Sequence, residues 1–173
     1  MNAGQQIKGQ SLYQRQQRNR STTGPAIICD GIQTPENLGA ILRVADAAGN
    51  QRVILLDSNI DLKNKKLSKL ARSTDRHLQI EHLSLEQFTN QRPGFGKVFA
   101  LEITTHSANV FETDASDCDA ILVGHESHGV RDEILQLCDA AVHLPMFGTN
   151  GSMNISHALA IFLYERHRQT QYK

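Results

Sequence analysis

The stretch AIICDGIQTPENLGAILRVADAAGNQRVILLD, residues 26–57, contains a predicted strand, a helix and a second strand in direct succession. Residues 26–30 and 52–57 are short apolar runs, typical of buried strands. The helix predicted over residues 35–49 has Thr34 as its cap and a proline at its first position. Two strands joined through a helix form a βαβ unit, so this stretch predicts a parallel sheet.

The same alternation continues through the rest of the chain. Four more strands are predicted at residues 78–83, 97–103, 120–124 and 140–145, and four more helices at 63–72, 84–91, 131–138 and from about 154 onward. Strands that are apolar throughout are covered on both faces, so we expect an α/β fold with a mostly parallel sheet and helices on both faces. Residues 25–173 are predicted to form this one domain, and residues 1–24 a flexible basic arm.

Composition and length exclude several classes of protein. In 173 residues, 39% are apolar and only 12 are Gly and 4 Pro, which excludes collagen and a fully disordered chain. The apolar runs are too short to cross a membrane, and residues 1–24 lack the apolar segment of a secretory signal. We expect reduced thiols and a cytoplasmic location, without a disulfide or zinc framework, because the three cysteines are widely spaced: Cys29, Cys118 and Cys138.

Charge is balanced overall but unevenly distributed. The chain has 18 basic and 18 acidic residues, yet residues 1–24 hold four basic residues and no acid, and residues 52–76 hold seven basic residues and three acids. Residues 112–139 hold eight acids and one basic residue. A neutral total disfavours a general polyanion binder, while the two basic segments leave room for a local phosphate-binding face. The alternative is a solvated surface loop and an unbound tail.

The sequence contains three candidate functional stretches. The first lies in the predicted helix over residues 35–49, and the second follows the predicted strand at 120–124. Arg43 interrupts an apolar helix and therefore needs an acid, a phosphate or a cleft as its partner; an ion pair with Asp46 is an equally good explanation. The sequence GHESHG, residues 124–129, places Glu126 where ligands bind in open α/β sheets, at the carboxyl end of a strand. His125 and His128 lack the HExxH spacing, so we expect no metal site there but a turn with two exposed histidines.

The third stretch is LPMFGTNGSMNISHALAIFLYE, residues 144–165, in which a glycine-containing loop leads into a long helix. Such a loop offers backbone N–H donors and the positive end of the helix dipole to a carboxylate or phosphate. The Gly-Lys-Ser/Thr signature of a P-loop is missing. Ser152 or Asn154 caps this helix, and Asn154 and Ser156 are either simple caps or site residues.

Taken in order, the three stretches resemble the motifs of the SpoU/TrmH family of SPOUT RNA methyltransferases. The resemblance spans about residues 24–168, with Met153 and Ile155 standing where the family has Leu and Val. The matching residues are Asn37, Gly39, Ala40, Ile41 and Arg43 in the first motif, Gly124, Glu126 and Gly129 in the second, and Pro145, Met146, Gly148, Ser152, Met153, Asn154, Ile155 and Ser156 in the third.

The resemblance implies a carboxy-terminal trefoil knot, a homodimer with the reaction site at its interface, and transfer of a methyl group to a ribose 2′-hydroxyl of tRNA or rRNA. It implies S-adenosylmethionine as the cofactor, held in the knot by Leu101, Glu102, Gly124, Leu144, Met146, Ser152 and Met153. The family's motifs favour ribose over base methylation. A non-catalytic RNA-binding protein with the same knot is the main alternative, and an α/β enzyme using another nucleotide is disfavoured because phosphate-loop motifs are missing.

By the same resemblance, Arg43 has the central catalytic role. A guanidinium stays protonated and does not act as a free base, so our hypothesis is that Arg43 binds the RNA phosphate beside the target ribose. Glu126 and Asn37 are expected to orient Arg43, and Asn154 with Ser152 to shape the path of the methyl group. Candidate RNA contacts are Arg15, Arg18, Arg20, Arg43, Lys65, Lys66 and Arg72.

Overall fold

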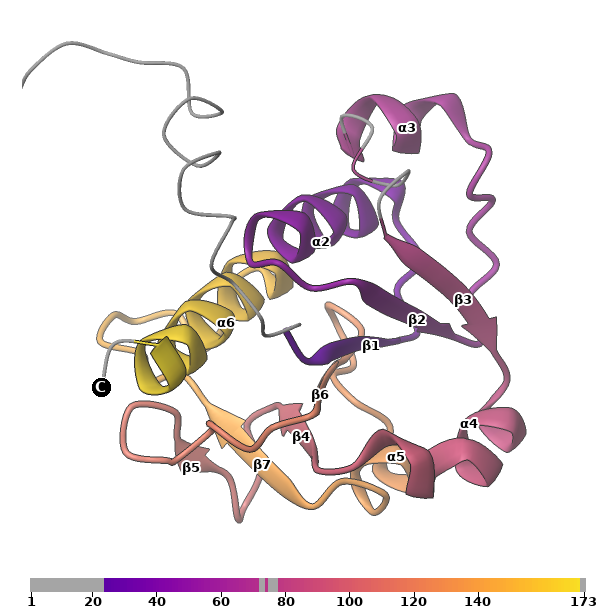
Figure 1. The fold of residues 1–173 in the computed structure, drawn as a ribbon. Helices are drawn as coiled ribbons and strands as arrows, with labels where there is room; N and C mark the ends of the chain where they lie inside the picture. Colours follow the sequence, from indigo (N-terminus) through magenta and orange to yellow (C-terminus); the bar gives the residue numbers. More distant parts are fainter. Residues whose placement is uncertain (1–23, 72–73, 75–77, 172–173) are drawn as a thin grey trace, which may run out of the picture.

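The computed structural model describes residues 24–71, 74 and 78–171, so almost all of the predicted arm lies outside the described residues. Seven strands form one sheet in the order β3-β2-β1-β6-β4-β7-β5 (Figure 1), and every pair is parallel. The predicted α/β fold with a mostly parallel sheet is confirmed. The strands are β1 (Ala26–Asp30), β2 (Arg52–Leu56), β3 (Gln79–Leu83), β4 (Val98–Leu101), β5 (Ala108–Asn109), β6 (Ala120–Val123) and β7 (Ala140–His143).

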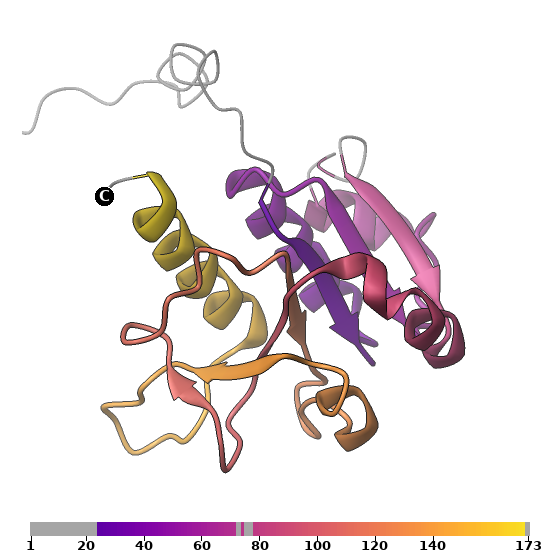
Figure 2. The same ribbon diagram turned by 60° about the horizontal axis from the view of Figure 1, so that its bottom comes forward.

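Successive strand residues point to opposite faces of the sheet, so strands that are apolar throughout expose apolar side chains on both faces. Helices cover both faces, as predicted. Ile27 of β1 packs into the core beneath α2, α3 and α6, and Ile28 into the core beneath α4, η3 and α5. Helices α2 and α6 pack beside each other (Figures 1 and 2). The helices are α2 (Pro35–Ala47), α3 (Lys65–Ala71), α4 (Leu85–Gln91), η3 (Arg92–Phe95), α5 (Asp132–Leu135) and α6 (Ile155–Gln171).

Helix α2 begins as its sequence predicts. The hydroxyl of Thr34 accepts a hydrogen bond from the backbone N–H of Asn37 at 3.4 Å, and Pro35 is the first helical residue. Six residues of α2 are buried, whereas Arg43, Asp46 and Ala47 form an exposed side of the helix. Local apolar content cannot show which side of a helix a neighbouring helix leaves open.

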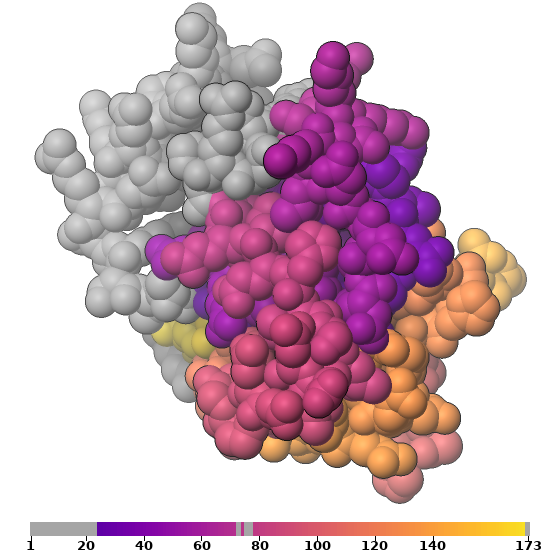
Figure 3. All heavy atoms as spheres, turned by 90° about the vertical axis from the view of Figure 1, so that its right-hand side faces the viewer, coloured from indigo at the N-terminus to yellow at the C-terminus, as the bar shows by residue number. Residues whose placement is uncertain are grey.

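Edge strand β3 is only partly buried, and Figure 3 looks onto this side of the molecule, where the segment around α3 projects from the surface. The strand at the other edge, β5, has two residues and was not predicted. Strand β7 lies between β4 and β5, although both precede it in the chain. This insertion brings the end of β7 beside the ends of β4 and β6.

An ion-pair network fixes the carboxyl ends of β1 and β2. Arg131, just before α5, donates from its Nε to Asp30 at 2.9 Å and pairs with Asp57 at 2.8 Å. Asp30 is almost fully buried, and a buried carboxylate is costly unless it is paired and hydrogen-bonded. The network therefore joins α5 to the same edge of the sheet at which the functional stretches meet.

Cys29, Cys118 and Cys138 are free thiols. Burial raises the pKa of the Cys29 and Cys118 thiols to about 12, so both are protonated and unreactive at neutral pH. Within the described ranges, no helix combines the length and the apolar character that crossing a bilayer requires.

Candidate active site

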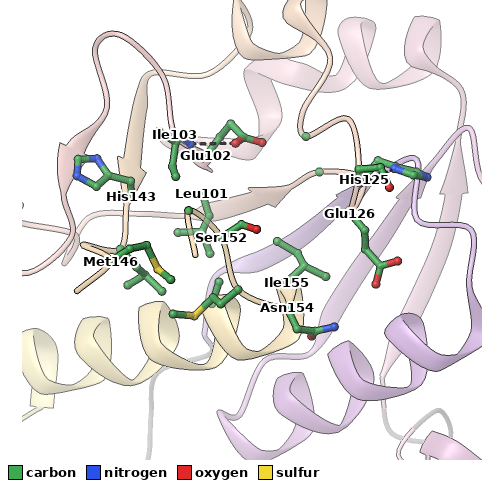
Figure 4. A pocket seen from close by; sticks show the side chains of 17 residues that line it. Leu101, Glu102, Ile103, His125, Glu126, His143, Met146, Ser152, Asn154 and Ile155 are labelled. Atoms are coloured by element: carbon green, nitrogen blue, oxygen red, sulfur yellow. Dashed lines mark hydrogen bonds between the residues drawn. The ribbon is translucent and has the colours of Figure 1, made fainter. Parts of the chain in front are cut away.

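A pocket of about 560 Å³ lies at the carboxyl ends of β4, β6 and β7, beside the start of α6 (Figure 4). Its walls come from three separate segments, at residues 101–103, 124–129 and 143–158. All seven residues expected to hold a cofactor line this pocket: Leu101, Glu102, Gly124, Leu144, Met146, Ser152 and Met153. The parallel sheet brings them together because strand ends that point the same way share one edge.

The 124–129 segment forms a closed turn without room for extra side chains. His125 and Gly129 exchange two backbone hydrogen bonds of 2.9 Å each. A Cβ at Gly124 would lie 2.2 Å from the carbonyl carbon of Gly129, so the two chain segments touch through their backbones. Gly129 itself has a φ of +68°, a conformation that favours glycine.

A hydrogen-bonded network joins the three motif segments through Asn37, which is buried in the first turn of α2. The amide nitrogen of Asn37 donates to the carboxylate of Glu126, and its oxygen accepts from the amide nitrogen of Asn154 at 3.2 Å. In Figure 4, Glu126 and Asn154 lie toward one end of the pocket, and Met146 and His143 toward the other.

Asn154 is at once a helix cap and part of this network. Its Oδ1 accepts from the backbone N–H of Ser156 at 2.9 Å and from the Ser156 hydroxyl at 2.6 Å. The alternatives left open by the sequence are therefore not exclusive. Ser152 lies in the pocket wall, two residues before the cap.

Arg43 is not among the residues that line this pocket, and Asn37 reaches it only through its hydrogen bonds with Glu126 and Asn154. The side chain of Arg43 is exposed, and it forms no hydrogen bond or ion pair with any other described residue, Asp46 included. Among the described residues of one chain, neither Glu126 nor Asn37 contacts Arg43 through a hydrogen bond, so their orienting role stays a prediction. Six helical residues separate Arg43 from Asn37, a rotation of about 240°, so the two side chains leave α2 on different sides.

The candidate RNA contacts fall into two groups. Lys65 and Lys66 are exposed on α3, where Lys66 pairs with Glu36 of α2. Four candidates lie outside the described residues: Arg15, Arg18, Arg20 and Arg72.

Several residues that line the pocket were not predicted from the sequence. Ile103, His143 and Ala158 line the pocket and directly flank or follow residues that the motifs singled out. Their position next to a motif is the only sequence feature that indicates them. Which neighbours of a motif line the pocket depends on the tertiary fold. His125 also lines the pocket and stacks on the exposed His128, with 4.8 Å between ring centroids. Among the described residues, no group of three or more His, Cys, Asp or Glu side chains could hold a metal ion.

This geometry defines an α/β protein with a small-molecule pocket built from three loops at the carboxyl edge of its sheet. Residues 24–164 match the sequence model of the SpoU rRNA Methylase family, so the chain belongs to that family. The resemblance of its motifs is thereby confirmed.

Similar proteins include a 23S rRNA guanosine 2′-O-methyltransferase of Bacillus subtilis, 30% identical over 145 residues that make up 83% of this chain and 58% of that protein. An AdoMet-bound rRNA methyltransferase from Sinorhizobium meliloti is 26% identical, with a TM-score of 0.77 over 87% of this chain and 59% of that one. A TrmH/SpoU tRNA modifying enzyme of Aquifex aeolicus is 25% identical, with a TM-score of 0.75 over 92% of this chain and 84% of that one. The chain thus spans somewhat more than half the length of the first two.

Proposed function

We propose that this protein is an S-adenosylmethionine-dependent RNA methyltransferase that acts on a ribose 2′-hydroxyl of tRNA or rRNA. The observation that carries the proposal is the pocket lined by the second and third family motifs, to which Asn37 of the first motif is tied by hydrogen bonds with Glu126 and Asn154. Family membership supports it, as do the similar proteins, which are named as rRNA and tRNA methyltransferases or modifying enzymes.

The residues of the pocket fit S-adenosylmethionine. A volume of about 560 Å³ is within the usual range for small-molecule sites. Apolar walls suit an adenine ring, the amino-terminal end of α6 suits a carboxylate, and the pocket carboxylates suit cationic groups. When bound, the cofactor supplies an electrophilic methyl group on a sulfonium. The residues proposed to hold it are Leu101, Glu102, Gly124, Leu144, Met146, Ser152 and Met153.

For such a reaction, the protein must position an alcohol and exclude competing reactions, because the cofactor carries the reactive group. Asn37 fixes the directions of the Glu126 and Asn154 side chains by binding both at once. Asn154 and Ser152 line the pocket beside α6, where we propose that they shape the approach of the ribose.

The proposed role of Arg43 is to bind the RNA phosphate next to the target ribose. A guanidinium presents five fixed donors and stays charged, which suits a phosphate and stabilises negative charge that develops on the ribose oxygen. Because Arg43 does not line the pocket of its own chain, we propose that it serves the pocket of a second copy.

The outer surface of α2 and α6 supports a homodimer. Ile161 and Tyr164 of α6 are 38% and 56% exposed, and the Tyr164 hydroxyl reaches the carbonyl oxygen of Ala47 on α2. Exposed apolar side chains on a helix, here α6 beside α2, are typical of a protein interface. A symmetric pair formed through this surface is the arrangement in which Arg43 would complete the partner's pocket.

We also propose the trefoil knot that the family resemblance implies. Its support is the place of β7 between β4 and β5, two strands that both precede it in the chain. In this proposal the 144–154 segment passes through a loop formed by residues between β4 and β6. Such threading is rare among proteins.

RNA is proposed to contact the exposed lysines of α3 in addition to Arg43. Lys65 and Lys69 have no ion-pair partner among the described residues, and α3 forms a projection on the surface (Figure 3). Basic side chains of this kind bind the phosphate backbone without reading sequence. The three free thiols, of which Cys29 and Cys118 are buried, support the proposed cytoplasmic location.

Two measurements test the proposed function. Calorimetry should detect S-adenosylmethionine binding to the full chain, whereas a non-catalytic RNA-binding protein of this fold should give no heat. Mapping 2′-O-methyl positions in total RNA from cells that lack the protein should reveal one or a few lost sites, and adding the purified protein with the cofactor should restore them. An unchanged map would contradict the enzymatic assignment.

A further inference from the structure

Glu102, directly after β4, is held rigidly in the pocket wall. Its Oε1 accepts from the backbone N–H of Ile103, and its Oε2 from the backbone N–H of Val130, each at 2.9 Å. A Cβ at Gly129 would lie 2.5 Å from Oε2, so the 124–130 loop follows the surface of this carboxylate. Figure 4 shows Glu102 beside Ile103 on the wall opposite α6.

Within the described ranges, the charge of Glu102 has no cationic partner. Neither Lys nor Arg is among the described residues that line the pocket, and Glu102 forms no ion pair with any described cation. The other pocket carboxylate, Glu126, accepts from the neutral side-chain amide of Asn37 on α2 and likewise forms no ion pair with a described residue. Glu102 therefore contributes a fixed negative charge that two neutral backbone amides orient but do not neutralise.

The two forms of the proposed cofactor differ in charge at one atom. S-adenosylmethionine carries a positive sulfonium, and its product, S-adenosylhomocysteine, has a neutral thioether with the same adenosine and amino-acid parts. A carboxylate in the wall of a cleft lowers the free energy of a bound cation and has little effect on a neutral sulfur.

We propose that Glu102 makes the pocket prefer the cationic methyl donor over its neutral product. This inference rests on the proposed function and adds a specificity-determining residue to it. Methyl transfer removes the positive charge from the sulfur, so the attraction of Glu102 ends when the reaction is complete. Glu102 thus favours both loading of the donor and release of the product.

The test compares three ligands by calorimetry on the full chain: S-adenosylmethionine, S-adenosylhomocysteine, and sinefungin, in which an amine-bearing carbon replaces the sulfonium. Glu102→Gln should lower the preference for each cationic ligand over S-adenosylhomocysteine by about fivefold to tenfold. Glu102→Asp keeps the charge but has a shorter reach, so all three affinities should fall together while the preference is largely kept. The control Glu86→Gln removes an exposed carboxylate on α4, away from the pocket, and should change nothing.

Equal loss of all three affinities in Glu102→Gln would overturn the proposal, because Glu102 would then only hold the loop. Circular dichroism and thermal melts establish that each variant is folded. Should Glu102→Gln fail to fold, the wild-type comparison still decides: tighter binding of S-adenosylhomocysteine than of both cations contradicts the proposal. Failure of all three ligands to bind the wild-type protein would instead refute the proposed function.

Discussion

The side chains of Asn37 and Glu126 are hydrogen-bonded although 89 positions separate them in the sequence. The same Asn37 amide accepts a hydrogen bond from Asn154, so one buried side chain connects all three motif segments. An amide can do this because it has both a donor and an acceptor. Aspartate would set two carboxylates against each other, and leucine would remove the hydrogen bonds to the Glu126 carboxylate and from the Asn154 amide nitrogen.

Asn37→Asp should therefore destabilise the fold by about 1–3 kcal/mol and slow methyl transfer at least about tenfold. Adding Glu126→Gln should recover most of the lost stability, because the new amide can donate to the new carboxylate. Urea unfolding of the single and double variants measures this coupling. A double variant no more stable than Asn37→Asp alone would argue against the hydrogen bond.

Gly124→Ala should lower both stability and cofactor affinity. The added Cβ would meet the backbone of Gly129 and Val130 at 2.2 and 2.3 Å, so the turn must move, at a cost of about 1–3 kcal/mol. Gly148→Ala is the matched control, because nothing lies within 4 Å of its added Cβ. Thermal melts and calorimetry with S-adenosylmethionine should separate the two variants, and equal behaviour would contradict the close packing of the turn.

Arg43→Lys keeps the charge but loses the planar pair of donors, so turnover should fall by about tenfold or more while cofactor affinity stays unchanged. Near-normal turnover would contradict two-point binding of the phosphate.

Mixing two inactive variants tests whether Arg43 acts across a dimer. Arg43→Ala retains its pocket, and Gly124→Ala retains its arginine. Random exchange of subunits should restore about a quarter of the wild-type activity, because half of the dimers are mixed and each has one intact site. Each variant alone provides the control, and a mixture that stays inactive would rule out the shared site.

Stability should fall in acid partly through Asp139. The backbone N–H of Val98, and then the Arg92 guanidinium, lower the pKa of this carboxyl below its usual value. A lowered folded-state pKa stabilises the fold above the unfolded pKa of about 4, and this stabilisation is lost as pH falls through the folded value. Asp139→Asn should thus unfold at a lower urea concentration than the wild type at neutral pH. The difference between their free energies of unfolding should become smaller as the pH falls.

The salt dependence of RNA binding tests the basic surface. Replacing Lys65 and Lys69 by Gln should weaken binding and reduce the slope of log affinity against log salt by up to about two. Deleting residues 1–20 should lower both affinity and slope in the same way. Unchanged slopes would mean that these residues do not contact RNA. They would then form the solvated loop and unbound tail that the charge pattern equally allows.

Much of the fold followed from local patterns. The apolar runs of residues 26–30 and 52–57 and the capped helix between them appear as predicted, because strand burial and helix capping depend on residues close in sequence. The two-residue strand β5 was missed, since so short a segment is a strand only through its pairing with β7.

The sequence alone identified the family through its ordered motifs and named seven residues that all line one pocket. Only the tertiary structure revealed that Asn37 holds Glu126 and Asn154, that Glu102 is fixed by the amides of Ile103 and Val130, and that Arg43 faces away from its own pocket. The physical reason is the range of the interactions: periodicity and capping act over a few residues, whereas these contacts depend on which strands lie side by side and which side of a helix stays open.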